Sequence, residues 1–327
     1  MKWLLILLLV LCISCKKEKL EATDQCIRER IEDSTVAIAT EQFIAGFSNL
    51  ANASGYQYDA KDDRGNQLDG IKVIEYAHNL FVGAYHTFKD NRFVVNIATS
   101  ENLTDWKFRT QLAANASQPY VFAGENNEIY VAWEQEPDNH LMIALYQNID
   151  SLIKNIPTKT KVLPQTLSTH AEGTPSIVAV SEEQIFIRFH YFFEGKRDLN
   201  AIGMLTRWEQ WETRPDHCLN ESIAAFGLKG NIGDRDEFLF KNEPFMIIEG
   251  QKTFNNFGTW QCYLYHNGNN KAWHIPFKTH HRSVNFANPT VSVLNVNSRE
   301  VLFFSLFIPS EKATPNEKGT FIGFYYL

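Results

Sequence analysis

The sequence has little of several features that mark common protein classes. Only 5 Cys and 4 Met occur among its 327 residues, and charged residues make up 21%. No Cys-x-x-Cys pair and no Cys/His spacing indicates a zinc site. The formal charge of -7 gives the chain no general hold on phosphate backbones, which argues against a nucleic-acid partner. No amphipathic helical stretch is long enough to cover a parallel sheet, which argues against an α/β fold.

Aromatic residues, in contrast, are abundant. The chain contains 24 Phe, 12 Tyr and 7 Trp, and hydrophobic residues make up 44% of it. This apolar content is enough for a large core and excludes wholesale disorder. Aromatic side chains fit pleated sheet surfaces better than packed helices. A chain of this length holds about two average domains or one large all-β domain.

The N-terminus has the pattern of an export signal. Lys2 precedes eleven apolar residues, 3–13, whereas a membrane span needs about 20. The segment Cys12-Ile13-Ser14-Cys15 resembles a bacterial lipobox, although Cys12 stands where Leu is usual. We expect a lipoprotein signal peptide over 1–14 and a lipidated tether over 15–33, with the lipid on Cys15. An ordinary cleaved secretion signal is the alternative.

These expectations place the protein on a membrane through its lipid anchor, in the periplasm or on the cell surface. They also leave three cysteines in the mature chain, Cys26, Cys218 and Cys262. Three is odd, so at most one intramolecular disulfide forms in an oxidising compartment. A Cys218–Cys262 disulfide and two isolated buried thiols both remain open.

The chain repeats one pattern five times. Each unit has an apolar run, a polar turn and a second apolar run, which together predict a β-hairpin. A third strand-like stretch follows, and several units add a fourth around a Trp. The first runs begin at Lys72, Pro119, Pro175, Glu237 and Pro289, and the second runs at Asn79, Asn127, Glu183, Asn242 and Ser298. Four strands recurring every ~50–60 residues are typical of β-propeller blades.

We therefore predict an all-β fold, a five-bladed β-propeller over 34–327. The last unit stops after its third strand, and we expect an early strand at 34–39 to supply the fourth and close the ring. A β-sandwich of ten or more strands is the alternative.

Alignment of the repeats produces columns of equivalent residues. One column is bulky and apolar, as packing between blades requires: Tyr85, Trp133, Phe189, Ile248 and Phe304. The next column is mostly ionisable: His86, Glu134, His190, Glu249 and Ser305. The starts of the innermost strands add Asp69, Gln118, Glu172, Asp234, Asp236 and Asn288. The second column either marks where strands reach solvent or gathers around the central funnel.

Several carboxylates converging on a funnel would raise one another's pKa values, which favours an acid–base pair near neutral pH. Two such carboxylates are the minimum needed to hydrolyse a glycosidic bond. The same oxygens could instead hold Ca²⁺. Arg188, inside a strand, needs a carboxylate or a substrate, because burying it alone costs several kcal/mol.

Two segments carry a family resemblance. ATSENLTDW (98–106) is similar to a segment that closes early blades of five-bladed glycoside hydrolases, and HAEGTPSIV (170–178) resembles the Glu-Gly-Pro segment of the family 43-like arabinanases and xylosidases. The resemblance implies Glu172 as the general acid and Asp69 as the general base. Other polar residues of the funnel would bind substrate: His86, Gln118, Glu134, Arg188, His190, Asp234, Asp236, Glu249 and Gln251.

Three departures weaken the resemblance to an active enzyme. The family usually begins its first blade with Asp-Pro, whereas this chain has Asp69-Gly70 there. The second blade offers Gln118 where the family has an Asp, so that Glu134, Asp234 or Asp236 would have to substitute for it. Thr174 is inserted before Pro175 and shifts Glu172.

The main hypothesis is thus a monomeric, exported glycoside hydrolase that acts on a carbohydrate and needs no cofactor. The alternative is a glycan-binding propeller that has lost its acid–base pair. A metal-assisted lyase or hydrolase using His86 and His190 is a third, weaker hypothesis. Trp133 and Trp260 either stack on sugars or pack between blades.

Overall fold

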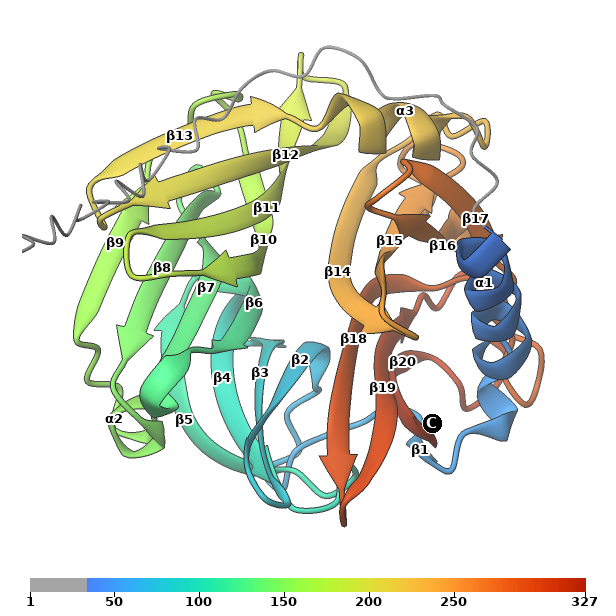
Figure 1. Ribbon diagram of the computed structural model, residues 1–327, viewed down its shortest axis with the longest axis horizontal. Coiled ribbons are helices and arrows are strands. Elements are labelled where there is room, and N and C mark those ends of the chain that lie inside the picture. Colours follow the sequence, from blue (N-terminus) through green and yellow to red (C-terminus); the bar gives the residue numbers. More distant parts are fainter. Residues whose placement is uncertain (1–33) are drawn as a thin grey trace, which may run out of the picture.

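The computed structural model describes residues 34–327, so the predicted signal peptide, Cys15 and the tether lie outside the described residues. Five four-stranded sheets form a ring (Figure 1). All their strand pairs are antiparallel. The predicted five-bladed β-propeller is confirmed, and the β-sandwich alternative is wrong.

Each blade begins with an innermost strand at the axis and ends with an outermost one. Blade I is β2 (Asp69–Ala77), β3 (Leu80–Lys89), β4 (Arg92–Ser100) and β5 (Lys107–Ala114), and blade II is β6 (Ala116–Ala123), β7 (Ile129–Gln135), β8 (His140–Tyr146) and β9 (Lys159–Leu163). Blade III is β10 (Glu172–Val180), β11 (Gln184–Phe193), β12 (Arg197–Thr206) and β13 (Gln210–Pro215). Blade IV is β14 (Ile232–Phe240), β15 (Glu243–Gln251), β16 (Trp260–His266) and β17 (Lys271–Ile275), and blade V is β18 (Ala287–Val296), β19 (Arg299–Ile308), β20 (Gly319–Tyr326) and β1 (Gly55–Gln57).

The five innermost strands contact one another around a central axis. Each begins at the same end of the axis, and each second strand returns to that end, as the pairing of Asp69 with His86 shows. We call this end the mouth. The loops between second and third strands also lie there, together with the connections between blades.

The space between blades is filled by the apolar column predicted from the repeats. Tyr85, Trp133, Phe189, Ile248 and Phe304 are all buried and belong to the hydrophobic clusters of the molecule. Trp133 is 6% exposed and donates its indole N–H to Gln135 (3.0 Å). Trp260 is 7% exposed. Both Trp side chains are buried in the blades, so neither offers an exposed ring face on which a sugar could stack.

The segment predicted to close the ring is a helix. Residues Ser34–Phe47 form α1, which lies along blades IV and V (Figure 1). Its buried residues recur at helical spacing, on one stripe: Val36, Ala39, Thr40, Phe43 and Phe47. Phe43 packs against Phe238, Phe240 and Phe304. The prediction of a strand at 34–39 is therefore wrong, because a stripe with this period buries its apolar residues only as a helix.

Another N-terminal segment closes the last blade. The short strand β1 pairs with β20 through Gly55–Phe324, Tyr56–Gly323 and Gln57–Ile322. The prediction that an N-terminal strand completes the last blade is thus confirmed, with the strand located 21 residues later than expected (55 − 34).

Five smaller elements lie on the connections: the helices α2 (Ile149–Ile153) and α3 (His217–Ala224), and three short 3₁₀ turns at Leu50–Asn52, Glu125–Asn127 and Phe257–Thr259. Within residues 34–327, no helix has the length and apolar character needed to cross a membrane. Cys262 is a free, buried thiol, so a Cys218–Cys262 disulfide does not form.

Candidate functional site

A backbone irregularity recurs at the mouth in all five blades. The pairing of each innermost strand with its neighbour shifts register directly after the first residues of the strand. In four blades a residue at this point has positive φ: Gly70, Gln118, Thr174 and Asn288. Bulges of this kind re-aim side chains and are frequent beside active sites. Three of these residues are not glycine, so the fold maintains a conformation that costs of order 1–3 kcal/mol each.

A small cavity on the axis at the mouth is lined by residues of all five blades, including Gly70, Gln118, Thr174, Asp234 and Thr290. No member of the ionisable column lines this cavity directly, but His86, Glu134, His190 and Glu249 each contact a residue that does. The predicted gathering of these side chains around the funnel is therefore confirmed.

Asp69, His86, Gln118 and Asn288 form one cluster of contacts at the mouth, with Asp69 at its centre. Its Oδ2 is 3.4 Å from His86 Nε2, and its Oδ1 accepts a hydrogen bond from Asn288 Nδ2 (3.3 Å). The Gln118 backbone N–H donates to His86 Nδ1 (3.4 Å), which leaves Nε2 to carry the ring proton toward Asp69. Asp69 of blade I thus contacts Asn288 of blade V directly, and it is connected to Gln118 of blade II through His86.

Glu249 links blades IV and V. Its Oε1 accepts the backbone N–H of Asp234 (3.0 Å), and its Oε2 accepts that of Asn288 (2.6 Å). The Asp234 carboxylate, in contrast, accepts no hydrogen bond from any residue that the structure describes. Asp234 and Arg235 are the blade IV residues that line the axial cavity, and Asp234 is only partly buried.

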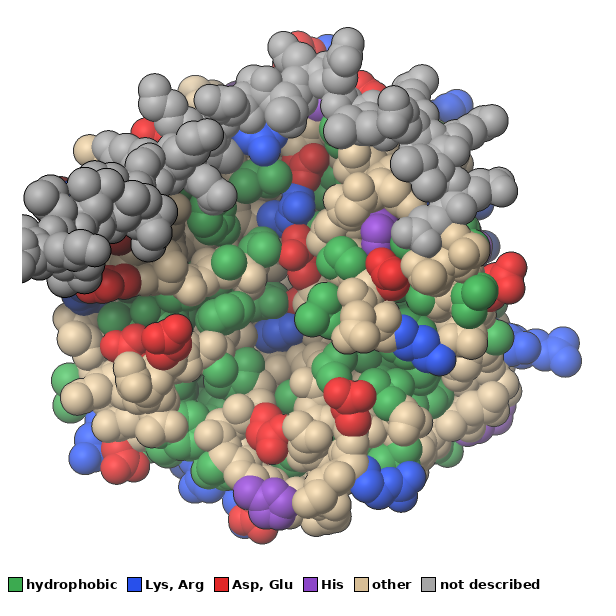
Figure 2. Space-filling model, viewed as in Figure 1, with side chains coloured by type: hydrophobic (Ala, Val, Ile, Leu, Met, Phe, Trp, Pro, Cys, Tyr) green, Lys and Arg blue, Asp and Glu red, His purple; other side chains and the backbone are tan. Residues whose placement is uncertain are grey.

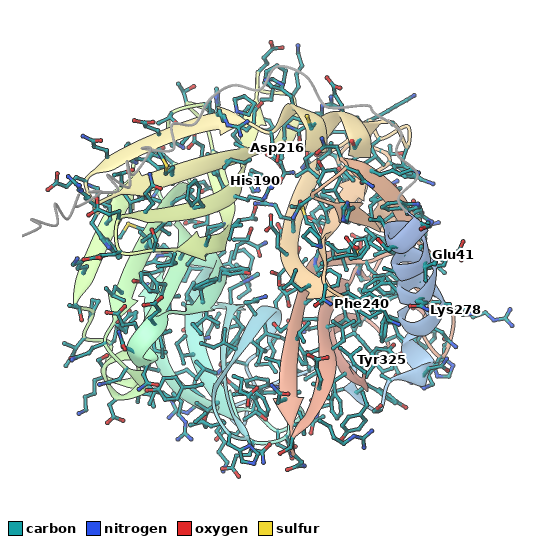
Figure 3. All side chains as sticks on the ribbon, in the orientation of Figure 1. Glu41, His190, Asp216, Phe240, Lys278 and Tyr325 are labelled. Atoms are coloured by element: carbon teal, nitrogen blue, oxygen red, sulfur yellow. The ribbon has the colours of Figure 1, made fainter. Side chains whose placement is uncertain are left out.

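Glu134 links blades II and III. Its Oε2 accepts the Thr174 backbone N–H (3.2 Å), and a Cβ on Gly173 would lie 2.0 Å from the same oxygen. Glycine at 173 therefore makes this approach possible. The Thr174 hydroxyl is 2.6 Å from His190 Nδ1, and His190 Nε2 is 3.9 Å from Asp198. Figure 3 labels His190 near the centre of the ring.

Arg235 is the buried cation of the mouth. Its guanidinium donates to the Thr174 carbonyl (2.9 Å), the Thr174 hydroxyl (2.6 Å) and the Gly233 carbonyl (3.1 Å). Because the Thr174 oxygen accepts from Arg235, its own proton is available for His190 Nδ1. Burial lowers the pKa of Arg235 to about 10, which still leaves it charged at neutral pH.

Burial also shifts the acids of the mouth. Desolvation raises the pKa of Glu134 to about 7, opposed by the Thr174 N–H and reinforced by Asp234 and Asp198. Desolvation raises the pKa of Asp234 to about 6, while Arg235 and His86 lower it and Asp69 raises it. Desolvation also raises the pKa of Glu249 well above its usual range. Burial lowers the pKa of His190, so its ring is neutral.

Glu172 does not join this group. It is 1% exposed, and its Oε1 accepts the backbone N–H groups of Thr166 (2.8 Å), Leu167 (2.5 Å) and Ser168 (3.0 Å). Register explains this position. Gly173 pairs with His190 as Asp69 pairs with His86, and Glu172 comes one residue earlier, opposite Tyr191. A shift of one residue turns a side chain to the other face of a strand. The prediction that the Glu172 and Asp69 carboxylates face each other across the funnel is therefore wrong.

Two further predicted substrate contacts, Arg188 and Asp236, bind other residues of the protein, and a third, Gln251, is buried with its side-chain oxygen unpaired. Arg188 is ion-paired with Asp216 and Glu237, where blades III and IV meet. Asp236 is completely buried and accepts hydrogen bonds from Lys72 Nζ (2.7 Å), the Tyr120 hydroxyl (2.8 Å) and the Val291 N–H (2.9 Å). Gln251, on the last residue of β15, is 2% exposed. The prediction that Arg188 needs a carboxylate partner is therefore confirmed, since it pairs with two. Asp236 lies below the mouth, bound to residues of the neighbouring innermost strands.

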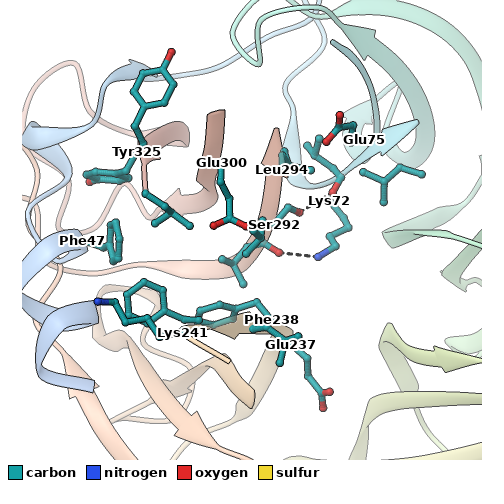
Figure 4. Close-up of a pocket in the computed structure, with 18 of the residues that line it drawn as sticks. Phe47, Lys72, Glu75, Glu237, Phe238, Lys241, Ser292, Leu294, Glu300 and Tyr325 are labelled. Carbon is teal, nitrogen blue, oxygen red and sulfur yellow. Dashed lines mark hydrogen bonds between the residues drawn. The ribbon is translucent and has the colours of Figure 1, made fainter. Parts of the chain in front are cut away.

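A larger cavity of about 1210 Å³ opens at the other end of the axis (Figure 4). Phe47, Phe238 and Tyr325 line it, with Lys241 and Glu300 among its charged residues. Two of its carboxylates are engaged, since Glu75 accepts from the Asn295 N–H (2.8 Å) and Glu237 pairs with Arg188. Tyr120 lines both cavities, so the Lys72–Asp236–Tyr120 contacts lie between the two ends.

Figure 2 shows side chains of both charges gathered in the hollow centre of the ring, bordered by hydrophobic ones. Across residues 34–327 no group of three or more His, Cys, Asp and Glu side chains is arranged to hold a metal ion.

No protein-family model and no curated protein matches this sequence. Solved structures do match. One described as a glycoside hydrolase superposes with a TM-score of 0.61 at 9% identity, over 88% of this chain and 94% of that one. A thermostable family-43 glycoside hydrolase gives 0.53 at 11% identity, over 79% and 89%. The α-L-arabinofuranosidase of Podospora anserina in complex with cellotriose gives 0.54 at 8% identity, over 84% and 98%.

The fold is a family 43-like five-bladed β-propeller. This confirms the resemblance inferred from the two short segments, and at these identities it establishes the fold alone.

Sequence reasoning missed three residues of this propeller's mouth. Arg235 lies beside the predicted Asp234, Thr174 has the look of a simple insertion, and Asp198 follows a polar turn. One signal was available for Thr174: Gln118, Thr174 and Asn288 each precede a proline at equivalent positions of the repeats. Arg235 and Asp198 occupy no repeated column, so only the structure could bring them to the mouth.

Proposed function

We propose that this protein is an exported glycoside hydrolase in which Asp69 is the general base and Asp234 the general acid. One observation carries the proposal: the mouth of the propeller holds carboxylates in two different environments. Asp69 accepts a hydrogen bond from Asn288 and lies 3.4 Å from His86 Nε2, whereas the Asp234 carboxylate accepts no hydrogen bond within the described chain and its pKa is raised to about 6. Environments that separate two acids in this way assign the acid and base roles.

The proposed reaction places a glycosidic bond over the axial cavity. Protonated Asp234 donates its proton to the leaving oxygen as the bond from that oxygen to the anomeric carbon breaks. Asp69 removes a proton from the attacking water, so that the water oxygen bonds to the anomeric carbon. In a retaining enzyme Asp69 would attack that carbon itself, and the anomeric configuration of the first product distinguishes the two routes.

The neighbouring groups support these roles. Arg235, 3.1 Å from the Gly233 carbonyl and next to Asp234, stabilises the carboxylate that remains after proton transfer. Neutral His190 and the Thr174 hydroxyl supply a donor and an acceptor for sugar hydroxyl groups. Glu134, whose pKa of about 7 also suits proton donation, is the competing candidate for the acid.

The test uses the mature chain and a panel of arabinan, xylan and β-1,3-galactan, because structural neighbours are described as an arabinofuranosidase, an endo-1,4-β-xylanase and an exo-β-1,3-galactanase. Release of reducing ends is measured for the wild type and for Asp69→Asn, Asp234→Asn and Glu134→Gln. Removing a positioned acid or base costs roughly 10²–10⁴-fold in rate. We expect that loss for Asp69→Asn and Asp234→Asn, and an alkaline limb of kcat/KM near pH 6 set by Asp234.

Glu172→Gln is the matched control. Its amide oxygen can still accept the N–H groups of residues 166–168, so we expect near wild-type activity. Loss of activity in Glu172→Gln with an active Asp234→Asn would overturn the assignment. Glycan binding without release of any product would instead favour the alternative, a binding propeller that has lost its acid–base pair.

We propose further that Cys15 carries the lipid that anchors the protein to a membrane, in the periplasm or at the cell surface. The lipobox-like segment 12–15 after an apolar run supports this, and 16–33 would be the tether. Expression in a bacterial host followed by detergent phase partitioning tests it. The wild type should enter the detergent phase, and Cys15→Ser should stay in the aqueous phase; equal partitioning of both would contradict the proposal.

A further inference from the structure

Exposed phenylalanines are confined to the mouth. Among residues 34–327, six Phe side chains are at least 36% exposed: Phe88, Phe93, Phe193, Phe226, Phe254 and Phe257. They lie on the β3–β4, β11–β12 and β15–β16 hairpins and on the connection from α3 to β14, all of which join strands at the mouth. At the other end of the axis, Phe238 and Phe240 are buried. Other exposed apolar side chains, such as Ile156 and Leu239, lie away from the mouth, so it is the exposed aromatic rings that mark this face as a candidate binding site.

Two of these rings lead directly to the candidate site. Phe93 meets His86 edge-on, with ring centroids 5.3 Å apart, and Phe88 meets Phe93 at 5.1 Å. His86 Nε2 is 3.4 Å from Asp69. The exposed fractions rise outward along this series, from 3% at His86 to 36% at Phe93 and 61% at Phe88. The rings therefore form a continuous aromatic surface from Asp69 to solvent.

The hairpin that carries the two rings is tightly turned. Its central residues, Asp90 and Asn91, have φ of 51° and 60°, the pair of positive values typical of a type I′ turn. Such a turn matches the twist of its strands and fixes their register. The rings are therefore presented in one arrangement before a ligand arrives, which lowers the entropy cost of binding.

The charges of the mouth select the kind of ligand. Asp234 and the buried cation Arg235 line the axial cavity. Glu134 and Glu249 accept backbone N–H groups of lining residues, and Asp69 directly precedes the lining residue Gly70. An anionic lipid surface resting on the rim would bring its phosphates toward these carboxylates. A sugar ring, in contrast, offers an apolar C–H face to an aromatic ring and hydroxyl groups to the carboxylates.

We propose that Phe88 and Phe93 form a sugar-binding subsite beside Asp69, and that the other exposed phenylalanines carry further residues of a polysaccharide chain. The identity of the ligand class rests on the proposed function; the location of the subsite rests on the ring geometry. The substrate is thus a polymer that extends over the rim, and the residue next to the cleaved bond stacks on the β3–β4 hairpin.

The test measures retardation of the native mature chain in gels containing arabinan, xylan or β-1,3-galactan. Four variants are compared: Phe88→Ala, Phe88→Ala/Phe93→Ala, Phe88→Leu and Phe88→Tyr. Leu239→Ala is the matched control, since Leu239 is 64% exposed but lies at the opposite end of the axis. Thermal unfolding of each variant verifies that it is folded.

We expect the double variant to bind the retained polysaccharide roughly tenfold more weakly, about 1.4 kcal/mol. Phe88→Tyr should bind as the wild type does, whereas Phe88→Leu should weaken binding as Phe88→Ala does, because stacking needs a ring. Leu239→Ala should leave binding unchanged.

Two results would overturn the proposal separately. Wild-type affinity in the folded double variant would refute the subsite and leave the proposed hydrolase intact. Retention of the wild type on phosphatidylethanolamine–phosphatidylglycerol vesicles and on none of the polysaccharides would refute a polysaccharide rim, and with it the substrate class of the proposed function.

Discussion

At the scale of single residues, the acids of the mouth differ in the number of hydrogen bonds that their carboxylates accept. Glu249 accepts two backbone N–H groups and Glu134 accepts one, yet burial raises the pKa of both. Desolvation therefore outweighs the hydrogen bonds at these positions. The consequence is a site that prefers to hold protons at mildly acidic pH, which suits proton donation and costs stability once the acids ionise.

A pH dependence of stability follows from Glu134. Its pKa rises from 4.5 to about 7 on folding, so between these pH values the native state holds a proton that the unfolded state has lost. The free energy of unfolding should therefore fall as pH rises from 4.5 to 7, by at most about 3 kcal/mol from this group. Asp234 contributes in the same direction.

Urea unfolding from pH 4.5 to 7 measures this dependence. The fall should be smaller in Glu134→Gln, which cannot ionise but can still accept the Thr174 N–H. Glu182→Gln, on an exposed turn, should keep the wild-type dependence. Parallel curves for the wild type and Glu134→Gln would contradict the raised pKa of Glu134.

At the scale of elements, α1 contributes to the core although it belongs to no blade. Phe43 is 0% exposed and meets aromatic residues of both blade IV and blade V, and Phe47 stacks edge-on with Tyr325. The helix therefore covers the apolar edges of these two blades, next to the strand that closes the ring.

Removing one of its buried rings should be costly. Phe43→Ala should lower the free energy of unfolding by about 3–5 kcal/mol, since the lost burial adds to the cost of the cavity left behind. Ile38→Ala, on the same helix but 54% exposed, should change it by no more than about 0.5 kcal/mol. Denaturant unfolding of both variants measures the difference, and equal effects would show that α1 is not packed as described.

At the scale of the whole molecule, one buried carboxylate joins four blades. Asp236 of blade IV accepts from Lys72 of blade I, Tyr120 of blade II and the Val291 N–H of blade V. The Lys72 ammonium also donates to the Val291 carbonyl (2.7 Å) and is 9% exposed. Charges this deep are stable only while both partners are present.

Neutralising one partner tests this connection. Asp236→Asn keeps one acceptor oxygen, which can serve the Val291 N–H, and turns an amide NH₂ toward the Tyr120 hydroxyl oxygen. It leaves the Lys72 charge buried without its carboxylate, and it should cost about 3–5 kcal/mol. Adding Lys72→Met removes that charge, so the double variant should be more stable than Asp236→Asn alone. A double variant less stable than Asp236→Asn would show that the ion pair is not what holds the blades together at this point.

Much of this architecture follows from local pattern. Strand periodicity and turn residues recur in each repeat, so the number of blades, the buried apolar column and the ionisable column at the mouth were all predictable. The helix at 34–47 was not, since its first six residues, rich in β-branched and small side chains, fit a strand equally well. Its packing partners lie about 200 residues away in the chain and decide the outcome.

Single-residue features of the site depended on the tertiary structure. The amino-acid order alone is enough to specify the propeller, because hydrophobic period and repeat length are properties of short segments. Only the tertiary structure shows that Glu172 accepts the backbone N–H groups of residues 166–168. The same holds for the ion pairs of Arg188 with Asp216 and Glu237. It also holds for the position of Asp234, which lines the cavity beside Arg235. A bulge of one residue reverses the direction of a side chain, and partners on other blades fix its charge. Neither is written in the local sequence.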